Sequence, residues 1–355
     1  MRGKRFGKWT YGIAAILFLF VGGMFFLPVP ERCWHDNMML ARTRSWYELA
    51  VGDSDTLYFT RLSACSFLSG FSVSADVARR EFLSNAFFVS YSGKLATAAD
   101  TLFLPDSIVR EDWLPALDNE LERLGKRIRN YRLLLDEMAY YERTHSVVDE
   151  GFHQVMEHQE LLRTKLAEME RSYDCAVRMR KRTGGVAYLH RTHEICCRTG
   201  KKEERKVHSC CRLVEDENGV AVWQTATGCL PFSSNRFRPN PFPYTKFHFP
   251  NHLYRVWGCF GDLRSLWAAD TFRVDMFCIK MKGGEPVLPV PETADGMPVA
   301  GEWGCLNGMM VRGRFVSSWN LYCLQWKHAA WHTCVWEDAG AWLRRVHRKI
   351  KEELE

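Results

Sequence analysis

Two apolar seams with heptad spacing occupy the middle of the chain and limit what it can fold into. Apolar or aromatic residues recur there at alternating spacings of three and four, which predicts helices that each bury one stripe against a partner helix. The segment "RTHSVVDEG" (143–151) separates the seams and is short enough to be a loop. Residues 111–182 are therefore predicted to form an antiparallel coiled-coil hairpin. The first seam consists of Leu114, Leu117, Leu121, Leu124, Ile128, Tyr131, Leu135 and Met138, and the second of Phe152, Val155, Gln159, Leu162, Leu166, Met169 and Tyr173.

The N-terminal segment predicts a membrane anchor. The basic stretch "MRGKRFGK" (1–8) precedes the uncharged run "WTYGIAAILFLFVGGMFFLPVP". About twenty apolar residues suffice to span a bilayer as a helix, so residues 9–28 are predicted to be a transmembrane helix. The basic flank should remain cytoplasmic, which places the rest of the chain in the cell envelope. A cleaved signal peptide is the alternative.

The charge of the chain argues against a nucleic-acid partner. The formal net charge is +6, and the basic stretch before the apolar run supplies four of these charges. The remainder of the 355 residues is therefore close to neutral and lacks the basic footprint that nucleic-acid binding requires.

The cysteines raise a metal hypothesis. Two clusters, "HEICC" (193–197) and "HSCC" (208–211), offer His193, Cys197, His208 and Cys211 as soft ligands for zinc. Adjacent cysteines on a strand point to opposite faces, so each pair can supply one ligand comfortably. Disulfides or buried free thiols are the alternatives, and their pairing cannot be read from the sequence.

The segments that flank the hairpin differ in composition. Residues 29–79 form a juxtamembrane segment in which "CWHDNMMLARTRSWYELA" (33–50) predicts a short helix. Residues 183–336 contain short apolar runs separated by turn residues, which predicts an all-β barrel or sandwich. Predicted strands include "GVAYLHR" (185–191), "GVAVWQTA" (219–226), "RVDMFCIKM" (273–281) and "NLYCLQW" (320–326). Residues 337–355 predict an amphipathic helix whose apolar face contains Ala339, Trp342, Val346 and Ile350.

One passage resembles a known family. "FLSNAFFVSYSGKLATAADTLF" (82–103) is similar to the strand hairpin of trypsin-like serine peptidases that ends in "TAAH" with the catalytic His. The resemblance implies a mainly β, chymotrypsin-type double β-barrel whose first part covers residues 80–110, with the helical hairpin inserted after it. "RVDMFCIKMKGGEPVLPVP" (273–291) resembles the strand that carries the catalytic Asp, which maps to Asp275. "DGMPVAGEWGCLNGMMV" (295–311) resembles the start of the second barrel, and the C-terminal helix resembles the one that closes the fold.

The catalytic positions implied by this resemblance are degenerate. Asp100 stands where the family has its His, and a carboxylate with an ordinary pKa of about 3.9 is a poor base for a serine hydroxyl. The family's G-D-S-G-G-P signature is absent. By chain order the nearest nucleophiles are Ser317 and Ser318 in "RGRFVSSWN" (312–320), which lacks the glycines of an oxyanion hole. Four histidines could replace the missing base: His190, His193, His208 and His328.

The sequence therefore predicts a membrane-anchored, extracytoplasmic peptidase homologue without catalysis and without a cofactor. Its partner would be an extended peptide held in a cleft by strand addition, or a protein that docks on the helical hairpin. The hairpin could also merely brace the barrel. The alternatives are an active serine peptidase with an atypical site, and an envelope scaffold stabilised by disulfides or by a Cys/His zinc site.

Overall fold

The computed structural model describes residues 11–19, 37–51, 55–61, 71–74, 80–98, 104–182, 184–199, 204–215, 218–231, 235–238, 253–269, 272–282, 285–287, 294–301 and 304–355. The predicted anchor lies mostly outside these residues, although residues 11–19 of it are described and are helical. Within the described ranges, no helix is both long enough and apolar enough to cross a bilayer.

The chain divides into two compact units. The first comprises residues 1–43, 82–103 and 192–355, and the second comprises residues 44–81 and 104–191. Two long strands, β1 (Met38–Val51) and β7 (Val186–Thr199), contribute residues to both units. Each unit has a hydrophobic core of its own.

Six strands of the first unit form a closed antiparallel barrel. Their order around the barrel is β1, β4 (Arg80–Phe88), β5 (Lys94–Ala98), β9 (Val220–Thr225), β8 (Glu204–Glu215) and β7, and β7 pairs back with β1. Numbered along the chain, the barrel strands follow the order first, second, third, sixth, fifth, fourth. The strands predicted at 185–191 and 219–226 are confirmed as parts of β7 and β9.

β1 corrects the helix predicted over residues 33–50. Every second side chain from Ala41 to Leu49 is buried, and the side chains between them are half-exposed. This period of two defines a half-buried strand. Because Thr43 and Ser45 are polar residues that face inward, the alternation is hidden from a reading based on hydrophobicity.

Six further strands form an open sheet that is a half-barrel. Its order is β12 (Glu285–Pro286), β11 (Asp275–Lys282), β10 (Leu253–Gly258), β13 (Pro298–Ala300), β14 (Leu306–Val311) and β15 (Arg314–Ser317). This is the strand order of the closed barrel, opened between its third and sixth strands. The repeat of one topology is consistent with a double barrel. Since the sheet begins with β10, the prediction that the second barrel starts at residue 295 is wrong.

The two barrels share a hydrophobic core. The alternation along β9 shows how: Val220 and Val222 belong to the shared core, whereas Ala221 and Trp223 fill the interior of the closed barrel. Trp257 and Met309 of the half-barrel join the shared core. A separate cluster fills the half-barrel, formed by Tyr254, Val256, Ile279, Met281, Ala294, Met297, Val299 and Met310.

Three helices complete the first unit: α5 (Leu263–Ala268), α6 (Ser318–His328) and α7 (Trp331–Leu354). α6 replaces the strand predicted over residues 320–326. Ser317 caps its N-terminus, and Leu321 and Leu324 are buried three residues apart, which is helical spacing. The predicted C-terminal helix is present as α7, but it begins earlier than residue 337.

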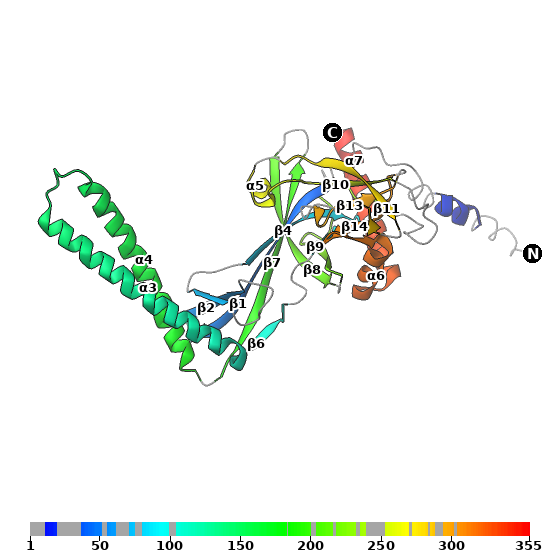
Figure 1. Ribbon diagram of the computed structural model, residues 1–355. Helices are drawn as coiled ribbons and strands as arrows, with labels where there is room; N and C mark the ends of the chain where they lie inside the picture. The colour runs from blue at the N-terminus through cyan, green and yellow to red at the C-terminus, as the bar shows by residue number, and fades with distance from the viewer. Residues whose placement is uncertain are drawn as a thin grey trace, which may run out of the picture. The chain divides into compact units, whose positions relative to one another are not determined.

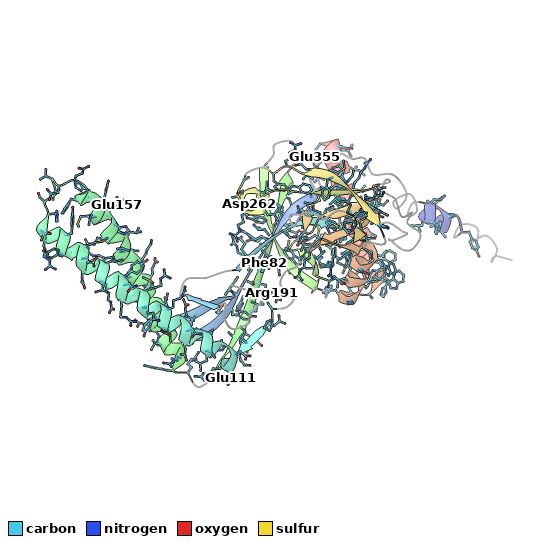
Figure 2. The ribbon with its side chains drawn as sticks, viewed as in Figure 1. Phe82, Glu111, Glu157, Arg191, Asp262 and Glu355 are labelled. Carbon is cyan, nitrogen blue, oxygen red and sulfur yellow. The ribbon has the colours of Figure 1, made fainter. Side chains whose placement is uncertain are left out.

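The second unit is built around two long helices, α3 (Arg110–Thr144) and α4 (Phe152–Arg180), which lie side by side in Figure 1. Glu111 and Glu157 in Figure 2 mark the base of the pair and the half nearer its loop. Arg132 and Glu170 form an ion pair between the helices at 2.6 Å. The sheet portion of the unit adds β2 (Asp55–Arg61), β3 (Phe71–Ser74) and β6 (Ser107–Val109) to the outer parts of β1 and β7.

The base of the helix pair is packed into this small sheet. Trp113 and Leu117 of α3 and Ala176 and Met179 of α4 share a core with Tyr47 of β1. In α3, all the buried residues lie between Trp113 and Ile128. The hairpin predicted as a bare insertion is therefore the helical part of a unit that includes residues of the predicted juxtamembrane segment.

Candidate functional site

Asp275 lies at the start of β11, opposite Gly258 of β10. Its half-exposed carboxylate pairs with Arg273, with 2.8 Å between Oδ1 and the guanidinium Nε. Asp275 is therefore a residue of the half-barrel. Within the described residues, no hydrogen bond or ion pair joins it to Ser317 or Ser318.

The two candidate serines have structural positions. The Ser317 side chain accepts a hydrogen bond from the backbone N–H of Asn320 at 3.5 Å and so caps α6. The Ser318 side chain is fully buried, and its Oγ has no hydrogen-bond partner among the described residues. A serine nucleophile needs an adjacent base and must be accessible to substrate, and among the described residues neither serine is hydrogen-bonded to a base.

The four histidines considered as replacement bases do not contact these serines within the described part of the chain. His190 lies 3.4 Å from Glu48 through Nε2 and stacks on Trp46. His193 is buried, with Nδ1 3.0 Å from the Thr43 hydroxyl. The other two lie in β8 and near the end of α6: His208 and His328.

The predicted zinc ligands do not come together. His193 lies opposite Cys210, and His208 lies opposite Ile195, in the pairing of β7 with β8. Because side chains alternate along a strand, Cys211 points to the face opposite that of Cys210, and it is exposed. Across the described ranges, no group of three or more potential ligands could hold a metal ion.

Cys210 and Cys211 of β8 are free thiols. Burial raises the pKa of the Cys210 thiol to about 12, and the nearby Cys211 and Glu194 add to the effect. Cys210 is therefore protonated at neutral pH, whereas the thiolate is the form that binds metals and attacks electrophiles.

A different constellation lies where the two barrels meet. Asn85 of β4 is fully buried, and its side-chain Nδ2 donates to the backbone carbonyl of Asp295 at 3.1 Å. Its Oδ1 accepts from the backbone N–H of Cys259 at 2.8 Å. The Ser84 hydroxyl and the Asn85 backbone N–H also donate to the Asp295 carbonyl, each at 3.2 Å. One strand of the closed barrel thus holds the turn that precedes β13.

Gly296 fixes the conformation of the same turn. Its φ is +79°, a region that favours glycine, and its N–H donates to the carbonyl of Met310 at 2.8 Å. A Cβ at this position would lie 2.1 Å from the Asn85 carbonyl oxygen. The backbones of the two barrels approach each other here too closely for any side chain.

The carboxylate of Asp295 completes the turn. Its Oδ1 accepts a hydrogen bond from the backbone N–H of Arg312, in the turn between β14 and β15. Residues 294–297 contain no hydroxyl or thiol group. The turn is positioned by several hydrogen bonds but supplies neither a hydroxyl or thiol nucleophile nor an imidazole base.

Sequence reasoning did not single out Asp295, although a signal was present. The residues "ADGMP" (294–298) match the G-D-S-G-G-P signature at Gly296 and Pro298. With that alignment, the serine of the signature falls on Asp295. The other position of interest, Asp100, lies outside the described residues, just beyond the end of β5.

Neither a protein-family model nor a curated protein sequence matches this chain.

Proposed function

We propose that this chain is a membrane-anchored, extracytoplasmic homologue of the trypsin-like serine peptidases that does not cleave peptides and acts by binding a protein partner. The fold supports the proposal because a closed barrel and a half-barrel repeat one strand order. The resemblance of residues 82–103 to the peptidase hairpin supports the assignment to this family, and the uncharged run after the basic N-terminus supports the membrane anchor.

The loss of catalysis is inferred from two aspartates. Asp100 takes the place of the family's His, and Asp295, in the turn held by Asn85, takes the place of its Ser. The second glycine of the signature is replaced by Met297, which is buried in the half-barrel core. An acidic pair at these positions lacks both the nucleophile and the base of the family's mechanism.

The binding role rests on one observation, the exposed apolar side chains of the helix pair. They lie in the connecting loop and in the halves of α3 and α4 nearer to it, and Val148 in the loop is 91% exposed. Several exposed apolar side chains in one region of a domain indicate an interaction site. The group consists of Leu133, Leu134, Tyr140, Val147, Val148 and Leu161.

We infer that this surface docks a helical partner. The heptad seams support a coiled-coil geometry for α3 and α4, and such a pair offers grooves that accept a third amphipathic helix.

A fluorophosphonate probe that labels active serines tests the loss of catalysis. The full chain in detergent micelles is treated beside Ser317→Ala, Ser318→Ala and the double variant Asp100→His/Asp295→Ser. The proposal predicts no labelling of the native chain. Labelling that disappears in one of the alanine variants would instead establish an active peptidase. Labelling confined to the double variant would locate the lost site at residues 100 and 295.

A further inference from the structure

The C-terminal helices expose an unusual number of tryptophans. Four indole side chains form what we call the tryptophan surface, and they are 50%, 37%, 63% and 75% exposed: Trp319, Trp326, Trp331 and Trp336. Elsewhere in the first unit, Trp223, Trp257 and Trp267 are buried. Large aromatic side chains are normally buried at a gain of free energy, so their exposure on two consecutive helices indicates a surface that something covers.

Helical geometry explains why these residues are exposed. Trp319 and Trp326 are two turns apart on α6, and their rings meet edge to face with centroids 5.4 Å apart. The opposite face of α6, which contains Leu321 and Leu324, is buried in the shared core. Two residues separate α6 from α7, and the two helices contact each other. α7 adds Trp331 and Trp336 in its first two turns, and its end is marked by Glu355 in Figure 2.

The acidic side chains next to Trp336 in the chain form ion pairs with basic residues of the first unit. Glu337 pairs with the buried Lys94 at 3.1 Å. Asp338 pairs with Arg236 at 3.0 Å and accepts hydrogen bonds from the backbone N–H groups of Tyr91 and Ser92. These carboxylates hold α7 on the closed barrel, and their charges are largely compensated there.

Some cations of the same two helices lack such partners. Four exposed basic side chains of α6 and α7 form no hydrogen bond or ion pair within the described residues: Lys327, Arg344, Arg348 and Lys349. Exposed indole rings with exposed cations on the same two helices match the interface of an anionic bilayer. Indole groups concentrate at the level of the headgroups, and Lys and Arg side chains near such a surface are attracted to its anionic headgroups.

We propose that α6 and α7 dock on the surface of an anionic lipid bilayer, with the rings of the tryptophan surface at headgroup depth. This inference rests on the proposed membrane anchor, which would hold the first unit near the bilayer that α6 and α7 contact. It adds a second attachment that fixes the orientation of the barrels above the membrane.

Quenching of tryptophan fluorescence by brominated lipids tests the proposal. The full chain, with Trp9→Phe and Trp34→Phe to remove signals near the anchor, is reconstituted into vesicles of neutral or anionic lipid. Bromine atoms are placed at a shallow or a deep position of the acyl chain. We expect stronger quenching by shallow bromine, most of it lost when Trp319, Trp326, Trp331 and Trp336 are all changed to Phe.

A charge variant keeps the test valid if the four-fold Phe variant does not fold. Lys327→Gln, Arg344→Gln, Arg348→Gln and Lys349→Gln together change only exposed side chains, and they should reduce quenching in anionic vesicles to the level seen in neutral ones. Trp342→Phe, a half-buried position on α7, serves as the matched control and should leave the quenching unchanged.

The outcomes separate the docking from the anchor. If the chain floats with the vesicles but its tryptophans are not quenched, the docking proposal is overturned and the anchor stands. If the chain does not float, both are overturned. If quenching is absent and the four-fold Phe variant changes a dimer into a monomer, the tryptophan surface is an interface between copies of this chain.

Discussion

Replacing Asn85 by Ala should destabilise the first unit selectively. Asn85 is fully buried, and its amide joins the closed barrel to two segments of the half-barrel, at the Asp295 carbonyl and at the Cys259 N–H. The alanine side chain can make neither hydrogen bond. Because the Cys259 backbone is buried, water cannot readily replace the lost acceptor.

The magnitude follows from these two contacts. Removing the acceptor of a buried backbone N–H costs about 1–3 kcal/mol. The Asp295 carbonyl keeps its hydrogen bonds from Ser84 and from the Asn85 backbone, so the loss there is at the low end of about 0.5–1.5 kcal/mol. The free energy of unfolding of the first unit should fall by about 1.5–3.5 kcal/mol.

Native-state hydrogen exchange measures this effect for each unit separately. Peptides from β4, β10 and β13 should lose protection in the Asn85→Ala variant, and peptides from α3 and α4 should not. Asn320→Ala, an exposed change on α6, is the matched control and should stay within about 0.5 kcal/mol of the native chain. Equal protection in the two variants would refute the role assigned to Asn85.

Three further changes test other parts of the structure. In urea denaturation, Gly296→Ala should lower the free energy of unfolding of the first unit by more than Gly313→Ala does. Both glycines have positive φ, but only the Cβ at 296 would meet the backbone of another strand. Equal losses of unfolding free energy would contradict this. Gln159→Leu should raise the melting temperature of the helix pair, measured by circular dichroism, by the equivalent of about 1 kcal/mol. The reason is that the buried Nε2 of Gln159 has no partner in the described residues. An unchanged or lower melting temperature would argue that water satisfies the amide. Cys211 should react with iodoacetamide near neutral pH while Cys210 does not, because burial raises the pKa of Cys210 to about 12. The contribution of Cys210 to stability is present below its ordinary pKa of about 9 and declines as the pH rises toward 12, since the unfolded chain loses that proton first. Modification of Cys210 in the native chain would refute its burial.

The helices of the second unit could be predicted from the sequence because their signal is periodic and long. The seams of residues 114–138 and 152–173 repeat through several turns, and few other structures produce that spacing. The strands at 219–226 and 273–281 could also be predicted, since each is a short apolar run between turn residues.

Other elements were hidden for physical reasons. β1 faces inward with Thr43 and Ser45, whose polarity conceals the period of two. α6 is rich in aromatic residues that favour strands, and its helix depends on the cap at Ser317 and on tertiary packing. The turn at Asp295 could not be placed at the junction without the fold, because its main contact, Asn85, is more than two hundred residues away in the chain.

The central claim, a peptidase fold that binds without cleaving, is tested most directly by a search for products. The full chain in micelles is incubated at acidic and neutral pH with a mixture of unmodified peptides, and mass spectrometry follows new chain ends. The account predicts that every peptide remains intact. Cleavage that is lost in Ser317→Ala or Ser318→Ala would contradict it, and so would acid-dependent cleavage that is lost in Asp295→Asn.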